Sequence, residues 1–155
     1  MKRALLIGAM ALAGCSVDNE SVNSYSVKQH NATTGLTLLP SENMWVSFEE
    51  MNTIYTNTEA CMGMWTYGPT VRFTNFMEVY GYIGGWGFYT PTGDGHIFIN
   101  TYDSGSPAGI ERDKYTDTET LKHEYVHHIL AGTGNDWHHG DPMFAKCGPG
   151  PNVSN

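Results

Sequence analysis

The spacing of apolar residues predicts a helix near the start of the globular part of the chain. Between Phe48 and Tyr55, apolar side chains recur every three or four residues, which is the repeat of one helix face. Ser47 stands just before this stretch, and Glu50 lies three residues after Ser47, in the pattern of a capping box. We therefore expect a helix over about residues 47–60.

Alternating and aromatic-rich runs predict strands in the middle of the chain. The clearest run extends from His96 to Tyr102, where Ile97 and Ile99 fall on one side of an extended chain and Phe98 on the other. Further strands are expected over residues 71–74, 78–83 and 86–90.

A second helix follows the strands. Thr116 and Glu119 repeat the capping-box pattern, and Gly132 is a typical residue to end the helix that they open. The order of helix, several strands and helix predicts an α+β domain with a small mixed or antiparallel sheet, rather than alternating βαβ units.

The first fifteen residues are typical of an export signal. Lys2 and Arg3 precede an apolar run that is too short to span a bilayer as a permanent helix. The run ends in Leu-Ala-Gly-Cys15, which resembles the bacterial lipobox, and that resemblance implies an acylated Cys15 as the first residue of the mature protein. We expect an exported protein anchored to the cell envelope by lipid. Ser16 after the cysteine resembles the outer-membrane sorting pattern if the host has two membranes.

Composition divides the remaining chain. Residues 16–35 are rich in Ser, Asn, Thr and Val, so we expect a flexible tether there and a single domain over 36–155. The net charge of −8 argues against a nucleic-acid partner, which would require a basic surface.

If Cys15 carries lipid, the other two of the three cysteines, Cys61 and Cys147, are left to form a disulfide.

The second predicted helix contains an HExxH motif, formed by His123, Glu124 and His127. Side chains four residues apart share a helix face, so the two imidazoles can bind one zinc ion. Glu124 is placed to take a proton from a zinc-bound water without binding the metal itself. The motif predicts a zinc hydrolase.

A catalytic zinc usually has a third protein ligand. The metzincin pattern would need histidine at position 133, where threonine stands, and a gluzincin would need a glutamate after Glu124, where the chain has none. The third ligand is therefore His138, His139 or Asp136. Asp141 is expected either to orient a ligand imidazole or to stabilise the turn at Pro142.

The stretch HEYVHHIL followed by a glycine-bearing loop and HGDPMF resembles the active site of SprT-like metallopeptidases and related exported zincins. This resemblance implies a zincin-like fold, with His123, His127 and His139 as zinc ligands and Glu124 as general base. It also implies that the strand from His96 is the edge strand along the cleft. The aromatic, glycine-rich run 80–89 either lines that cleft or forms ordinary strands.

Three functions fit these residues. The first is a metallopeptidase in which Glu124 passes a proton to the leaving amine of a peptide. The second is a non-catalytic, zinc-binding surface lipoprotein, which would have no use for Glu124. The third is a zinc hydrolase acting on a non-peptide amide.

Overall fold

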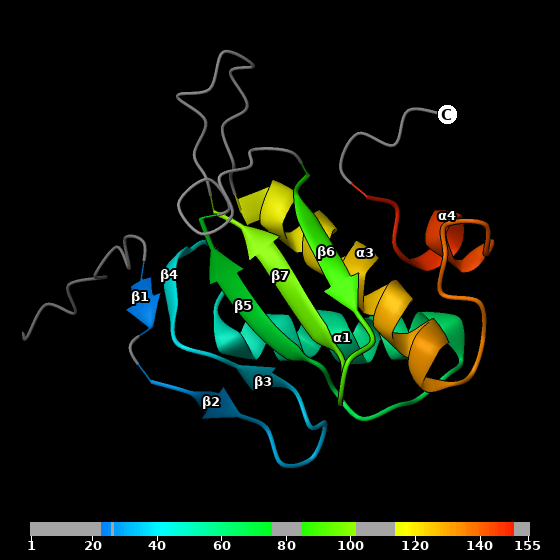
Figure 1. Cartoon of the computed structure of the whole chain (residues 1–155), viewed down its shortest axis with the longest axis horizontal. Coiled ribbons are helices and arrows are strands. Elements are labelled where there is room, and N and C mark those ends of the chain that lie inside the picture. Colours follow the sequence, from blue (N-terminus) through cyan, green and yellow to red (C-terminus); the bar gives the residue numbers. More distant parts are fainter. Residues whose placement is uncertain (1–22, 26, 76–84, 102–113, 151–155) are drawn as a thin grey trace, which may run out of the picture.

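The computed structural model describes residues 23–25, 27–75, 85–101 and 114–150. A five-stranded sheet packs against two long helices (Figure 1). In sheet order, the strands are β2 (Gln29–His30), β3 (Thr37–Leu38), β5 (Thr70–Thr74), β7 (His96–Asn100) and β6 (Gly87–Thr90). A separate pair is formed by β1 (Asn23–Tyr25) and β4 (Ser41–Met44), and the helices are α1 (Phe48–Met62), α3 (Lys114–Gly132) and the short α4 (Met143–Cys147).

The five-stranded sheet is mixed. Strands β3, β5 and β7 run parallel, while β2 and β6 pair antiparallel at the two edges. The register aligns residues in rows across the sheet: Phe73 lies beside Ile99, and Ile99 lies beside Gly87. Because alternate residues of a strand point to opposite faces, each row belongs to one face of the sheet.

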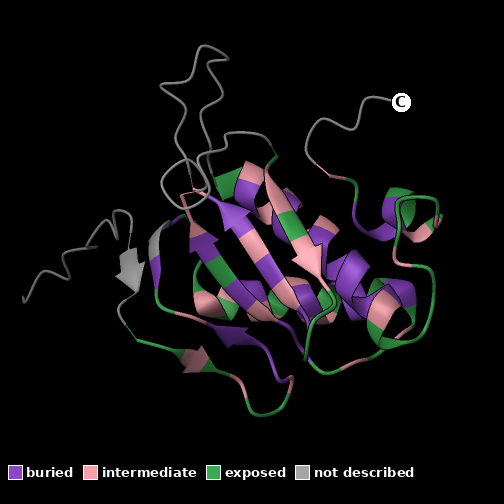
Figure 2. Cartoon of the chain, viewed as in Figure 1, coloured by how far each residue is buried: buried purple, intermediate pink, exposed green. Residues whose placement is uncertain are grey.

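The hydrophobic core lies between one face of the sheet and the helices α1 and α3 (Figure 2). The sheet contributes side chains such as Val71, Phe73, Ile97 and Ile99, all of them almost completely buried. The two helices meet through an aromatic pair, with the rings of Tyr55 and Tyr125 5.1 Å apart in an edge-to-face arrangement. This contact fixes α3 against α1, and burial of each large apolar side chain contributes about 1.5–3 kcal/mol.

The first helix forms as the sequence predicts. Ser47 is its N-cap and accepts a hydrogen bond from the backbone N–H of Glu50, and Gly63 ends it in the left-handed conformation. The second capping box is wrong, because α3 already includes Lys114 and Thr116 lies inside the helix. There the Thr120 hydroxyl donates to the carbonyl of Thr116. The end of α3 at Gly132 is confirmed.

The expected strands are confirmed where the structure describes them: 70–74, 87–90 and 96–100. The expected strand 78–83 lies outside the described residues, as do the export signal, Cys15 and residues 16–22 and 26 of the expected tether. The mixed α+β architecture is confirmed. Among the described residues, no helix is long and apolar enough to cross a membrane.

The folded part of the chain begins earlier than Leu36. Gln29 and His30 form β2 and pair with β3, so the expected boundary between tether and domain falls inside a hairpin. Gly35 closes that hairpin with a φ of 81°, and its backbone N–H donates to the carbonyl of Asn31. The short polar residues of this stretch suggested a flexible tether, but in the structure they form a turn.

The predicted disulfide between Cys61 and Cys147 is present. It joins the last turn of α1 to the last residue of α4, which are 86 residues apart in sequence. Closing so long a loop in the unfolded chain reduces the entropy gained on unfolding.

We predict that the double variant Cys61→Ser, Cys147→Ser loses about 2–5 kcal/mol of unfolding free energy, since it removes this cross-link. Urea titration followed by circular dichroism measures the loss. Wild-type protein in excess reductant should show a similar loss. An unchanged midpoint in both samples would contradict a stabilising role for the bridge.

Candidate metal centre

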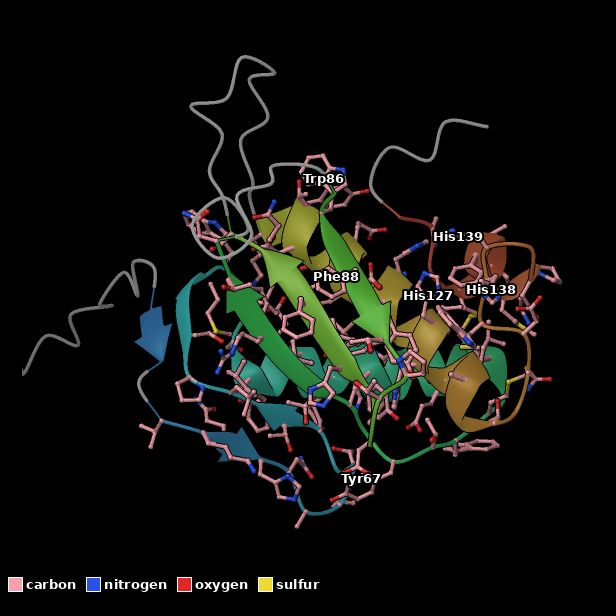
Figure 3. The ribbon with its side chains drawn as sticks, viewed as in Figure 1. Tyr67, Trp86, Phe88, His127, His138 and His139 are labelled. Carbon is pink, nitrogen blue, oxygen red and sulfur yellow. A yellow bond between two sulfur atoms is a disulfide. The ribbon has the colours of Figure 1, made fainter. Side chains whose placement is uncertain are left out.

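Three histidines converge at one end of a cleft. His123 and His127 come from successive turns of α3, and His139 comes from the loop between α3 and α4 (Figure 3). The Nε2 atom of His139 lies 3.0 Å from Nε2 of His123 and 3.2 Å from Nε2 of His127. Ligands bound tetrahedrally at about 2.0–2.1 Å from one ion would lie about 3.3 Å from one another. The three histidines could therefore hold a metal ion.

Backbone carbonyls fix the orientation of two of these rings. The Nδ1 atom of His123 lies 2.9 Å from the carbonyl oxygen of Gly148, and that of His127 lies 2.6 Å from the carbonyl oxygen of Trp137. Since a carbonyl oxygen can only accept, each Nδ1 carries the hydrogen, and each Nε2 presents a lone pair to the centre. Metal-binding histidines are commonly oriented in this way.

Burial keeps the two rings neutral. It lowers the pKa of His127 to about 4 and lowers the pKa of His123, in each case against the raising effect of the carbonyl hydrogen bond. Only a neutral imidazole offers a lone pair to a metal. The ring of Phe144 lies beside all three histidines, with centroid distances of 5.1, 4.5 and 5.2 Å to His123, His127 and His139. Phe144 thus covers one side of the cluster, in which His127 is buried and His139 is exposed.

Glu124 is buried next to the three histidines. Only 5% of its surface is exposed, and its Oε2 atom has no hydrogen-bond partner among the described residues. Burial raises the pKa of Glu124 to about 8. A buried carboxylate without a partner destabilises a fold, so its presence points to a chemical role.

The structure separates the candidates for the third ligand. His138 and Asp136 pair with each other, Nδ1 to Oδ1 at 2.6 Å, and their side chains are 70% and 71% exposed. Hydrogen bonds from His138 lower the pKa of Asp136. Asp141 accepts a hydrogen bond from the backbone N–H of Met143 at 2.8 Å, so it stabilises the turn before α4. Only His139 joins the two histidines of the motif.

The other histidines lie elsewhere. His128 is buried, and its Nε2 lies 2.7 Å from the carbonyl oxygen of Tyr67, in agreement with a packing role. The Nδ1 of His30 lies 2.8 Å from the hydroxyl of Thr37 across the β2–β3 hairpin. His96 lies on β7 with its ring stacked near Phe98, at a centroid distance of 6.4 Å.

A cleft of about 870 Å³ opens over the three histidines. Residues 85–89 form one wall, which confirms that part of the aromatic, glycine-rich run lines the cleft. The expectation that the strand from His96 is the edge strand is wrong. That strand, β7, lies between β5 and β6, and β6 is the edge strand. Its stronger alternation reflects burial on the core face rather than a place beside the cleft.

Gly87 lets the edge strand approach α3 closely. A Cβ atom at this position would lie 2.8 Å from Cγ2 of Thr120 and 3.2 Å from Oε1 of Glu124. Two residues further along β6, the ring of Tyr89 lies parallel to that of His127, with centroids 6.3 Å apart. The edge strand thus covers the motif helix along the turns that carry Glu124 and His127.

The roles of Gly148, Trp137 and Tyr89 were not predicted. Gly148 and Trp137 act through backbone carbonyls, which every residue possesses, so their residue types give no signal. Tyr89 was noted only as part of an aromatic run, and its contact with His127 depends on the sheet register.

Searches of protein-family models, curated proteins and solved structures give no match for this chain. The resemblance to SprT-like metallopeptidases therefore rests on the motif and the loop after it.

We predict that His139→Ala lowers zinc affinity by more than about a hundredfold. Loss of a residue that only hydrogen-bonds to a metal ligand already lowers metal affinity by about 10–100-fold, and His139 would be a ligand itself. His138→Ala is the matched control, since His138 is exposed and paired with Asp136. Competition with a chromophoric chelator measures both affinities. Equal losses in the two variants, or no loss in His139→Ala, would contradict a site built from His123, His127 and His139.

Proposed function

We propose that the protein is a zinc-dependent metallopeptidase with Glu124 as general base. The observation that carries this proposal is the buried carboxyl group of Glu124, whose Oε2 atom has no partner among the described residues, next to three converging histidines. A purely structural metal site would be stabilised by an apolar residue at this position, since a buried carboxylate without a partner is costly.

Zinc is the metal that suits this donor set best. Three neutral imidazoles at tetrahedral spacing and one side open to a cleft are typical of catalytic zinc sites. Bound zinc would polarise a water molecule and lower its pKa towards about 7. Such a site needs a nearby base and room for a substrate, and Glu124 and the cleft provide these.

Glu124 would transfer the proton. It is the residue after His123, so its side chain leaves α3 towards the same end of the cleft, and the approach of Gly87 confines it there. A carboxylate with a free oxygen can accept a proton from the attacking water and donate it to the leaving amine. Exclusion of water by Phe144 and the β6 wall would strengthen these interactions.

The edge strand supports a peptide as substrate. The backbone N–H of Asn100 donates to the carbonyl of Trp86 at 2.8 Å, so residues 86, 88 and 90 direct their backbone groups towards β7. In an antiparallel pair the alternate residues, Gly87 and Tyr89, direct theirs outwards. An extended peptide could add to this edge and lie over Glu124.

The disulfide supports the proposal that the enzyme acts outside the cytoplasm. Stable disulfides are typical of exported proteins, and Cys61 and Cys147 form one here. We therefore retain the proposal of an exported, lipid-anchored enzyme.

We predict that Glu124→Gln abolishes hydrolysis, with a loss of at least about a hundredfold in kcat/KM, while zinc remains bound. Mass spectrometry of a mixed peptide library incubated with zinc-loaded protein detects cleavage. Glu119→Gln is the matched control, because it makes the same change on α3 outside the cleft lining. Zinc-loaded wild-type protein that cleaves no peptide, or an active Glu124→Gln variant, would overturn the proposal.

We also predict that Gly87→Ala lowers kcat/KM by at least about tenfold without loss of zinc, because the new methyl group would push β6 away from Thr120 and Glu124. Gly140→Ala serves as control: Gly140 lines the same cleft, and a Cβ there meets nothing within 4 Å. Peptide assays and metal analysis of both variants make the test. Equal activity in the two variants would show that the close approach of β6 is unimportant.

A further inference from the structure

The cleft wall is dominated by apolar side chains. Aromatic residues occur on both sides of it, with Trp86 and Tyr89 on the side of β6 and Trp137 and Phe144 on the segment after α3. Among the described residues that line the cleft, none is Lys or Arg, and Glu124 and Asp141 are the carboxylates. A substrate side chain in this cleft would therefore meet rings and backbone rather than charged partners.

Neither carboxyl group of the lining is placed to pair with a charged substrate side chain. Glu124 is buried beside the histidines, and Asp141 accepts from the backbone N–H of Met143. A charged substrate side chain would lose its hydration without gaining an ion pair, which is unfavourable. An apolar side chain would gain contact area instead. These properties of the cleft suit an uncharged, apolar segment.

Trp86 is the residue best placed to contact such a substrate side chain. It stands at the start of the edge strand, held by the hydrogen bond from Asn100 to its carbonyl. Gly85, with a φ of 83°, turns the chain into this position, and Gly87 follows it. Figure 3 shows the indole where β6 begins, and Trp86 is half-buried and lines the cleft.

We infer that the substrate is an extended peptide segment with an aromatic or large aliphatic side chain beside the scissile bond, and that Trp86 is a specificity-determining residue. This inference rests on the proposed peptidase function. It concerns the choice among peptides, so it can fail while that function stands.

Internally quenched peptides that differ at one residue test the inference. Each series places Phe, Leu, Ser, Asp or Lys on one side of the scissile bond, and zinc-loaded full-length protein is the enzyme. We expect kcat/KM for Phe or Leu to exceed that for Asp or Lys by at least about tenfold on at least one side. Trp86→Ala should reduce the Phe-to-Ser ratio at least about fivefold with zinc content unchanged. Trp65→Ala, which removes an indole that is 72% exposed and outside the cleft lining, should leave the ratio unchanged.

A second measurement separates binding from turnover. Calorimetric titration of zinc-loaded Glu124→Gln with the same peptides should give the same order of affinities. Glu124-dependent cleavage with equal rates for Phe, Asp and Lys peptides would overturn the inference and leave the proposed function intact. Selectivity that persists in Trp86→Ala would overturn the assignment to Trp86. A failure to cleave any peptide, with no ranked binding, would overturn both.

Discussion

The burial of one side of α3 is the constraint on which the rest of the structure depends. Leu121, Tyr125 and Ile129 of this helix are completely buried in the core, with Tyr125 packed edge-to-face on Tyr55 of α1. These apolar contacts fix the rotation of the helix about its axis. The same rotation directs His123 and His127 towards the cleft. The core thus sets the direction of the ligand side chains before any metal arrives.

The third ligand depends on a segment with little core of its own. Between Gly132 and Asp141 nearly every residue is exposed. The loop is held in its middle, where the Trp137 carbonyl accepts from His127. Beyond its end, Phe144 packs on the histidines and the disulfide ties Cys147 to α1. The carbonyl of Gly148, next to Cys147, orients His123. The cross-link therefore restrains both the loop and one ligand of the centre.

Local chemistry was predictable from sequence, whereas placement was not. The Ser47 cap, the spacing of His123 and His127, and the cysteine pair are encoded by residue type and spacing, and the structure bears them out. The edge strand was misplaced because the resemblance assigned it from its position before the motif helix, whereas strand order depends on contacts distant in sequence. For the same reason, the stretch before Leu36 was interpreted as a tether although its pairing partner follows it. The choice of His139 over His138 also depended on which of two adjacent rings faces inwards.

Glu124 shows how stability and function are connected in this fold. A carboxylate buried to this extent loses hydration, and the described residues provide no donor to its Oε2 atom, so it destabilises the metal-free protein. A cation held by the three histidines would offset that cost by its charge and would accept the lone pairs that His123 and His127 direct at the centre. Metal binding would then add to the stability of the folded state, as linkage requires for any ligand that the unfolded chain binds less well. The features that cost stability in this centre are those that would favour a bound metal ion.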